Sequence, residues 1–464
     1  MAAPMMLALR GVPCLCRPVS RRLSHSAAFL EAAARRGLFK DVFPAESGPT
    51  RLYELLGSGP QTAYCGFDPT ADSLHVGNLL AVLGLIHFHR AGHNVIAVIG
   101  GATGRLGDPS GRGREREALR PEALAGNIRG IRGCLERLFG NCEALVPGGR
   151  PGGTVTILDN EQWYRHRGAA DFLASVGRHF RMGPMLSRHS AQSRLGSPEG
   201  MSLSEFLYPL FQAYDFYYLH RNRNCTIQLG GTDQLGNIMS GHDFIQRVTG
   251  EEVFGVTVPL VTNTAGDKLG KSAGNAIWLN RDRTSPFELY QFFVRQPDSA
   301  VGRFLKLFTF IPLPEIERIM EQHQAEPERR LPQKRLAAEV TKIVHGNGGL
   351  ESAKRCTQAL YQSSVEALDK MSDRELQELF REAPFTEVLL EPGTRVMDLC
   401  LKVSAVPEGA RGYEMISSGG LSINHRKVTN PDEVLVPGQH ILQNGLSLLR
   451  VGKKNFYVVK WLHL

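Results

Sequence analysis

The sequence predicts an α/β protein: a parallel β-sheet domain with helices on both faces, then an all-α domain and a small α+β domain. Short apolar runs rich in β-branched residues recur between residues 62 and 261, separated by longer segments of helical period. Such alternation is typical of parallel sheets. Strand signals stop near residue 285, and the composition changes again near residue 391. A chain of 464 residues is also too long for one ordinary domain.

The apolar runs and helical periods place the elements in order. The first helix of the sheet domain is expected to end at Gly92 and the second to begin at Pro121, because glycine often closes helices and proline suits their first turn. Ligands of such sheets bind beyond the carboxyl ends of the strands. The expected strands are residues 62–67, 94–101, 154–160, 225–231 and 256–261, and the expected helices are 77–92, 121–140, 202–221 and one from about residue 234.

The first 30 residues have the composition of an organellar presequence. They carry four arginines, half of the formal net charge of +8, and no acidic residue. The arginines follow the apolar run, whereas a secretory signal is charged before it, so this segment predicts import into the mitochondrial matrix; a basic tail without a targeting role is the alternative. Eight scattered cysteines without a C-x-x-C pair fit a reducing compartment and predict no metal site. No apolar run approaches the ~18 residues of a membrane span, so no membrane association is expected.

Two loops that follow expected strands carry candidate ligand-binding groups. His75 and Asn78 lie in "HVGN" at the start of a helix, where unpaired N–H groups favour an anion, and Gly77 would let a flat ring approach the backbone. The loop "GGATGRLGDPSG" contains Asp108 and glycines that let backbone amides approach a ligand. An ordinary capped helix and a surface loop are the alternatives.

The helix "EFLYPLFQAYDF" carries the most informative pattern. Tyr208, Gln212 and Asp215 are spaced i, i+4 and i+7, which places them on one face of an otherwise apolar helix. Buried polar groups need partners, so these side chains either pair with one another or face a polar ligand. Tyr64, on the first expected strand, could reach the same cavity.

Two further loops add candidate residues. Asp233 and Gln234 follow a glycine turn, where an aspartate either caps a helix or accepts the hydroxyls of a ribose. The segment "TAGDKLGKS" ends like a phosphate-binding P-loop, but Ala265 stands where that motif needs its first glycine. The role of Lys268 and Lys271 therefore needs another explanation.

Taken in order, "HVGN", "GGATGRLGDPSG", "EFLYPLFQAYDF", "GGTDQLGN" and "KLGKS" resemble the motifs of class I aminoacyl-tRNA synthetases, and more narrowly those of the bacterial-type tyrosyl-tRNA synthetases. The resemblance covers nearly the whole chain after residue 35, and the presequence points to the mitochondrial form. It implies a Rossmann-like catalytic domain that activates L-tyrosine with ATP and transfers it to the terminal ribose of tRNA(Tyr). Asn78 replaces the last histidine of the family's HIGH motif, and "KLGKS" keeps both lysines of KMSKS.

The resemblance also implies a role for each candidate residue. His75, Asn78, Thr70, Lys268 and Lys271 would stabilise the phosphates of ATP, which Mg²⁺ accompanies. The implied tyrosine site consists of Tyr64 and Asp215 for the phenol hydroxyl, with Asp108, Tyr208 and Gln212 for the α-amino group. The implied adenylate site, beside Lys271, consists of Cys65, Asp68, Gly77, Gly231, Asp233 and Gln234.

The remaining domains would bind RNA. We expect domain boundaries at 1–30, 31–284 with an inserted dimer or connective segment, 285–390 for an α-helical anticodon-binding domain, and 391–464 for an RNA-binding domain. Residues 395–464 hold nine Lys/Arg against five Asp/Glu, so phosphate contacts are expected there; a solvated basic surface is the alternative. The candidate contacts are Arg426, Lys427, Lys453 and Lys454, with Lys460 nearby. The resemblance further implies a homodimer.

Two other functions remain as alternatives. A tryptophanyl-tRNA synthetase would share the class I motifs, but Tyr64 and Asp215 suit a phenol. An RNA-binding factor that keeps a synthetase scaffold would share the basic C-terminal segment, although it would not need His75, Lys268 and Lys271.

Overall fold

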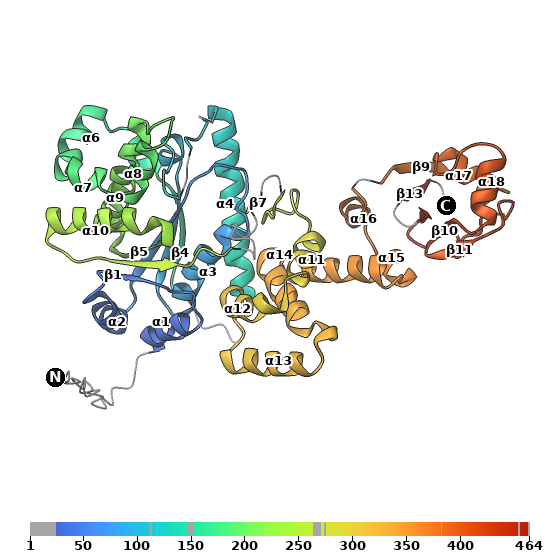
Figure 1. Cartoon of the computed structure of the whole chain (residues 1–464), viewed down its shortest axis with the longest axis horizontal. Coiled ribbons are helices and arrows are strands. Elements are labelled where there is room, and N and C mark those ends of the chain that lie inside the picture. Colours follow the sequence, from blue (N-terminus) through green and yellow to red (C-terminus); the bar gives the residue numbers. More distant parts are fainter. Residues whose placement is uncertain are drawn as a thin grey trace, which may run out of the picture.

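The computed structural model describes residues 25–111, 114–117, 119–145, 152–262, 271–272, 275–381, 383–452 and 455–462. Within these ranges a sheet domain is followed by a helical region and a small second sheet, which lie one after another along the long axis (Figure 1). The predicted sequence of an α/β, an all-α and an α+β part is confirmed.

The large sheet has the strand order β1-β6-β5-β2-β3-β4 in the described part of the chain. All neighbouring strands are parallel except β1, which pairs antiparallel with β6. The chain runs from β2 to β3 and β4 on one side and returns to β5 and β6 on the other, so the order reverses beside β2. The strands are β1 (Val42–Phe43), β2 (Thr62–Phe67), β3 (Asn94–Ile99), β4 (Val155–Asp159), β5 (Cys225–Gly231) and β6 (Phe254–Val258).

Helices cover both faces of this sheet, as expected. Alternate residues of β2 point to opposite faces: Cys65 joins the core beneath α3 and α4, whereas Tyr64 joins the cluster beneath α9 and α10. The helices of this domain are α1 (His25–Arg35), α2 (Gly48–Ser58), α3 (Val76–Arg90), α4 (Pro121–Ala144), α5 (Glu161–Tyr164), α6 (Ala169–Ser175), α7 (Met182–Leu186), α8 (His189–Leu195), α9 (Leu203–Arg223) and α10 (Leu235–Thr249).

Helix α1 crosses the boundary that we expected at residue 30. Leu30 and Ala33 are buried in the main core. The guanidinium of Arg36 donates hydrogen bonds to the carbonyl oxygens of Lys306 and Ile311, 2.9 and 2.8 Å away, and so ties α1 to the helical region. The folded domain therefore begins by residue 25, and the segment that resembles a presequence lies, up to residue 24, outside the described residues.

The helical region shares its core with the sheet domain instead of forming a separate one. Leu289, Phe293 and Phe304 belong to the same buried cluster as the strands. Gly346 has φ 71° and bends the longest helix. The helices are α11 (Pro286–Val294), α12 (Asp298–Phe308), α13 (Leu313–Ala325), α14 (Leu331–Tyr361), α15 (Val365–Asp369) and α16 (Asp373–Leu379).

The C-terminal sheet begins earlier than the predicted boundary at residue 391. Its first strand, β9, pairs parallel with β13 near the end of the chain, so it belongs to this sheet and not to the helical region. The strand order is β11-β10-β12-β13-β9. The elements are β9 (Phe385–Leu389), α17 (Val396–Lys402), α18 (Ala410–Ser417), β10 (Leu421–Ile423), β11 (Arg426–Val428), β12 (Leu446–Val451) and β13 (Asn455–Leu462), and a separate hairpin consists of β7 (Lys271–Ser272) and β8 (Asn275–Ala276).

Candidate active site

Polar side chains gather at the carboxyl edge of the large sheet, where the strand order reverses. Asp68 follows β2, Thr103 follows β3 and Asn160 follows β4. The Thr103 hydroxyl donates to Asp68 Oδ1 at 2.9 Å, and Asn160 Nδ2 donates to Thr103 Oγ1 at 3.0 Å. The resemblance implied Asp68 as an adenylate contact, whereas Thr103 and Asn160 were not predicted, although both follow strands of the sheet.

Asn160 connects this cluster to Asp215 on α9. The Asp215 carboxylate accepts hydrogen bonds from Trp163 Nε1 at 2.8 Å, the Tyr164 hydroxyl at 2.8 Å and Asn160 Nδ2 at 3.1 Å. Burial raises the pKa of Asp215 to about 7, while these three donors oppose the shift. A buried carboxylate held by three donors is well oriented to accept a further hydrogen bond.

The hydroxyl of Tyr64 lies buried near Asp215, and no hydrogen-bond partner for it exists among the described residues. Its ring packs at 5.2 Å from the ring of Phe216. Burial, and then the charge of Asp215, raise the pKa of Tyr64 well above its usual value, so the group is a neutral hydroxyl. A buried hydroxyl without a partner is costly, which suggests that a bound ligand supplies one.

The predicted polar face of α9 is confirmed. The Tyr208 hydroxyl donates to Asp68 Oδ2 at 2.9 Å, Gln212 Oε1 accepts from Asn237 at 3.0 Å, and Asp215 lies in the network above. Burial, and then the nearby Asp108, raise the pKa of Asp68 to about 6. The i, i+4, i+7 spacing thus delivers all three side chains to the edge of the sheet.

Asp108 belongs to an adjoining cluster on the α10 side. Its carboxylate accepts from Gln234 Nε2 at 2.7 Å and from the backbone N–H of Ser110 at 3.0 Å. Asn237 Nδ2 lies 3.0 Å from Gln212 Oε1 and 3.1 Å from Gln234 Oε1. Asn237 therefore joins α9 to α10, and it is a site residue that sequence reasoning missed.

The glycine pair after β3 serves close packing. A Cβ atom on Gly100 would lie 2.2 Å from Asp68 Oδ1 and 2.3 Å from Thr103 Oγ1, and one on Gly101 would lie 2.2 Å from Asp159 Oδ1. Only residues without a side chain fit against these carboxylates. The groups that approach Gly100 and Gly101 are side chains of the protein itself, and the approach of backbone amides to a ligand stays a prediction.

"HVGN" forms the start of α3. His75 Nδ1 accepts from the N–H of Gly77 at 3.0 Å, and Asn78 Oδ1 accepts from the N–H of His75 at 3.1 Å, which is a capping box. The next backbone N–H, of Val76, donates to the carbonyl of Ile277 at 2.9 Å. The motif is therefore both a helix cap and the partner of residues just beyond the lysine loop.

The lysine loop is described only in part. Lys271 begins β7, and its backbone pairs with Ala276 of β8, directly before the segment that contacts "HVGN". Lys268 lies outside the described residues. The backbone thus directs the end of the loop toward the start of α3.

Thr70, predicted to contact the phosphates, and two of the predicted adenylate residues, Gly231 and Cys65, have different surroundings. Thr70 is exposed, and its N–H donates to the carbonyl of Asp68 at 2.9 Å. Gly231 ends β5, and a Cβ atom there would lie 2.6 Å from Asp233 Oδ1. The Cys65 thiol is buried in the core beneath α3, and burial raises its pKa to about 12. Cys65 is thus not a member of the polar network.

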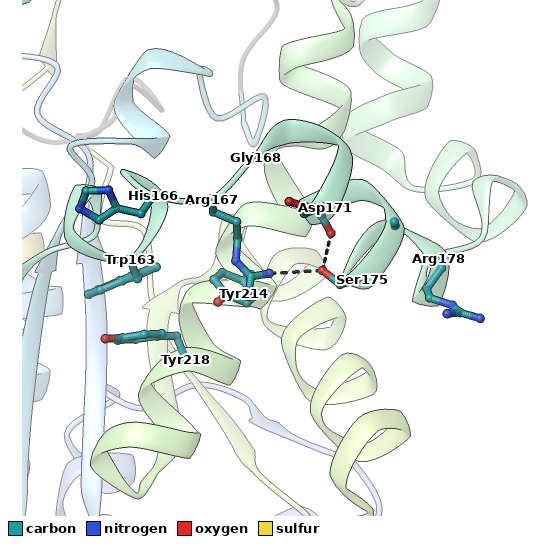
Figure 2. A pocket seen from close by; sticks show the side chains of 10 residues that line it. Trp163, His166, Arg167, Gly168, Asp171, Ser175, Arg178, Tyr214 and Tyr218 are labelled. Carbon is teal, nitrogen blue, oxygen red and sulfur yellow. Dashed lines mark hydrogen bonds between the residues drawn. The ribbon is translucent and has the colours of Figure 1, made fainter.

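Figure 2 shows a pocket that residues of α5, α6 and α9 line, Trp163 among them. Its volume is about 660 Å³. Arg167 lies 4.6 Å over the ring of Tyr214, and Tyr218 stacks on Trp163 at 4.6 Å. Trp163, which donates to Asp215, and Tyr214, the sequence neighbour of Asp215, both line this pocket. Sequence reasoning did not predict it.

The predicted RNA contacts divide into three groups. Arg426 and Lys427 are exposed on the edge strand β11, after a tight turn in which Asn424 and His425 have φ 49° and 66°. Lys453 and Lys454 lie outside the described residues. The Lys460 ammonium is 2.9 Å from Asp373, so this lysine, which we expected on the basic surface, pairs within the protein.

Within the described ranges no cluster of three or more metal-binding side chains occurs. In the same ranges no helix has the length and apolarity that a membrane span requires.

Comparison with known proteins identifies relatives along almost the full length. A family model described as tRNA synthetases class I (W and Y) matches residues 58–362. The mitochondrial tyrosine–tRNA ligase of Homo sapiens is 64% identical over 453 residues, which cover 96% of this chain and 95% of the relative. The corresponding Drosophila melanogaster protein is 51% identical and covers 92% and 93%. The crystal structure of a C-terminally truncated Aspergillus nidulans mitochondrial tyrosyl-tRNA synthetase aligns with a TM-score of 0.65 at 34% identity, covering 72% of this chain and 94% of that chain.

Proposed function

The chain belongs to the tyrosyl-tRNA synthetases of class I and acts as a mitochondrial tyrosine–tRNA ligase, and from this premise we propose that the network at the sheet edge binds L-tyrosine and ATP. The enzyme activates tyrosine as tyrosyl-adenylate and then transfers it to tRNA(Tyr). The mitochondrial matrix is the proposed compartment.

The observation that carries the assignment of the site is the unpartnered hydroxyl of Tyr64 beside Asp215. A phenol hydroxyl placed between them would accept from Tyr64 and donate to Asp215. Both groups would then be satisfied, whereas phenylalanine would leave the Tyr64 hydroxyl without a partner at a cost of roughly 1–3 kcal/mol. The same pair of residues disfavours tryptophan, because the indole N–H cannot accept a hydrogen bond from the Tyr64 hydroxyl.

The α-amino group of tyrosine would lie further along the edge. Asp108, Tyr208 and Gln212 are the proposed contacts; Asp108 and Gln212 both approach Asn237, and Tyr208 holds Asp68. Asp108 lies close enough to Asp68 to raise its pKa, and two carboxylates this close attract an ammonium group. Asp68, Gly77, Gly231, Asp233 and Gln234 would surround the adenylate, while the backbone of Cys65 lies on the adjoining strand.

In the activation step, the carboxylate of tyrosine attacks the α-phosphate of ATP and pyrophosphate leaves. Lys268 and Lys271 would neutralise the charge that accumulates on pyrophosphate, and His75, Asn78 and Thr70 would contact the phosphates. The pairing of "HVGN" with residues beyond the lysine loop supports a shared phosphate site. Preorganised cations at developing charge lower the barrier of such displacements. Mg²⁺ enters with ATP as part of the substrate.

We further propose that the helical region, α11 to α16, and the C-terminal sheet bind the tRNA. Arg426 and Lys427 lie exposed on an edge strand, where they could contact phosphates, and Lys453 and Lys454 belong to the same basic segment. Such contacts would set affinity and its salt dependence without reading sequence. Replacing Arg426 and Lys427 with alanine should weaken tRNA binding and reduce its salt slope by about 2.

A homodimer is the proposed assembly. Helices α6 to α10 lie together at one end of the molecule (Figure 1). They carry exposed large apolar side chains, of which Met182 is 65% and Leu203 70% exposed. Exposed apolar residues gathered in one region are typical of protein interfaces. Sedimentation of the wild type should give a dimer, and Leu203→Asp should shift it toward monomer; a monomeric wild type would contradict this proposal.

Amino-acid-dependent ATP–pyrophosphate exchange tests the function. The chain should exchange with tyrosine and not with tryptophan or phenylalanine, and it should then charge tRNA(Tyr). Exchange with tryptophan alone would contradict the assignment of Tyr64 and Asp215. A folded protein that exchanges with none of the three, yet binds a non-tRNA RNA tightly, would contradict catalysis altogether.

A further inference from the structure

We propose that Tyr164 is a positioning residue that orients the Asp215 carboxylate and thereby decides which of its oxygen atoms receives the substrate hydroxyl. This inference rests on the proposed tyrosine site. Tyr164 ends the short helix α5, in the segment between β4 and α9, and none of the motifs considered in the sequence includes it.

The Tyr164 hydroxyl touches α9 at two points one turn apart. It lies 2.8 Å from the carbonyl oxygen of Phe211 and 2.8 Å from Asp215 Oδ1. The hydroxyl has one hydrogen, and the bond to an ionised carboxylate is the stronger of the two. Tyr164 therefore donates to the carboxylate of Asp215, and its hydroxyl oxygen also contacts the backbone of α9, the helix that carries Asp215.

The hydrogen bonds are distributed unequally over the two oxygens of Asp215. Oδ1 accepts from Trp163 Nε1 and from Tyr164, whereas among the described residues Oδ2 accepts from Asn160 Nδ2 alone. A carboxylate offers about four acceptor positions, two on each oxygen. With Oδ1 filled, the remaining position lies on Oδ2, and a substrate hydroxyl must bind there. Without the Tyr164 bond, both oxygens could accept it.

The ring of Tyr164 is fixed independently of its hydroxyl. It packs against Phe211 at 5.2 Å, Tyr214 at 5.6 Å and Phe172 at 6.0 Å between ring centroids. Phenylalanine at this position would keep these contacts and remove only the hydrogen-bond donor. Tyr164→Phe thus isolates the positioning role.

The titratable groups around Asp215 lie on α5, on or directly after β2, and on α9. Only Tyr164, on α5, is changed in this variant. Tyr164 itself favours the ionised form of Asp215, so its removal should raise the pKa of that carboxyl. The other groups are Tyr64 on β2, Asp68 after β2, and Tyr208 and Tyr214 on α9.

Pyrophosphate exchange by the full chain tests the proposal, with Tyr214→Phe as the matched control. Tyr214 lies next to Asp215 in sequence but lines the pocket in Figure 2, and among the described residues no hydrogen bond joins its hydroxyl to Asp215. Tyr164→Phe should raise KM for tyrosine about tenfold, as expected for one lost hydrogen bond to a charged group. Its kcat and its KM for ATP should stay within about twofold of the wild type. The acid limb of kcat/KM for tyrosine should move to higher pH, and the control should resemble the wild type.

Three results would overturn the proposal. A lower KM for tyrosine would mean that Tyr164 occupies the place of the substrate hydroxyl. Equal increases of KM for tyrosine and KM for ATP, or failure of the variant to fold, would mean that the role of Tyr164 is structural. An unchanged KM for tyrosine and an unchanged pH profile would mean that Tyr164 has no role at this site. Wild-type exchange with tyrosine would leave the proposed function intact in each case, whereas an inactive wild type would remove both.

Discussion

Tyr64→Phe should stabilise the free protein and weaken its binding of tyrosine. The hydroxyl is buried without a hydrogen-bond partner in the part of the chain that the structure describes. Its removal relieves a desolvation cost of roughly 1–3 kcal/mol and leaves the ring packing against Phe216 in place. The same hydroxyl is the proposed donor to the substrate, so the variant loses one hydrogen bond on binding, worth about 1 kcal/mol or more.

Two assays separate these effects. Thermal unfolding of the ligand-free variant should show a midpoint raised by about 2 °C or more. This shift follows from the desolvation free energy that is removed and from the usual change of midpoint per kcal/mol in a domain of this length. Pyrophosphate exchange should show KM for tyrosine raised about five- to tenfold, with KM for ATP unchanged. A lower unfolding midpoint together with an unchanged KM for tyrosine would refute the reasoning, because the hydroxyl would then have a structural partner instead of a ligand.

The remaining predictions concern the glycine pair, the pH dependence and the lysine loop. Gly100→Ala should reduce kcat/KM for tyrosine by a hundredfold or more, on the order of 3 kcal/mol, because its Cβ atom would displace Asp68. Gly126→Ala is the control and should be active, because no atom lies within 4 Å of the added Cβ. Equal activity of the two variants would contradict the packing argument. The pKa of Asp215 is raised to about 7, and the ionised form accepts the substrate hydroxyl. For this reason kcat/KM for tyrosine should fall as the pH falls through 7. A flat profile from pH 8 to pH 6 would show that ionisation of Asp215 is not needed. Lys271→Ala should slow adenylate formation in single-turnover experiments by roughly a hundredfold or more while the affinity for tyrosine stays the same; collapse of that affinity would contradict the role of this lysine.

Local patterns were sufficient to predict five strands of the large sheet and four of the helices that cover it, α3, α4, α9 and α10. Five strands and the polar face of α9 follow from β-branched runs and from the i, i+4, i+7 spacing, both of which are properties of short segments. The two-residue strand β1 is too short to leave such a signal. The parallel order then places the ends of β2, β3 and β4 side by side, although Asp68 itself was a candidate only through the resemblance to the family.

Long-range contacts account for what the sequence did not predict. Asn160 and Asn237 act through partners more than 20 residues away, and nothing in their own segments distinguishes them from loop or helix polar residues. Strand β9 was assigned to the helical region because its partner, β13, lies at the other end of the domain. Lys460 looked like part of a basic surface, but its partner Asp373 is 87 residues earlier.

The kinetics of Asp215→Ala test the central claim, that the buried network recognises the phenol hydroxyl of tyrosine. KM for tyrosine and KM for ATP would be measured by pyrophosphate exchange, beside circular dichroism to show that the variant is folded. The account predicts that KM for tyrosine rises at least a hundredfold, since the substitution removes the acceptor of the substrate hydroxyl and breaks three hydrogen bonds of the network, while KM for ATP changes little. A folded variant whose KM for tyrosine equals that of the wild type would contradict it.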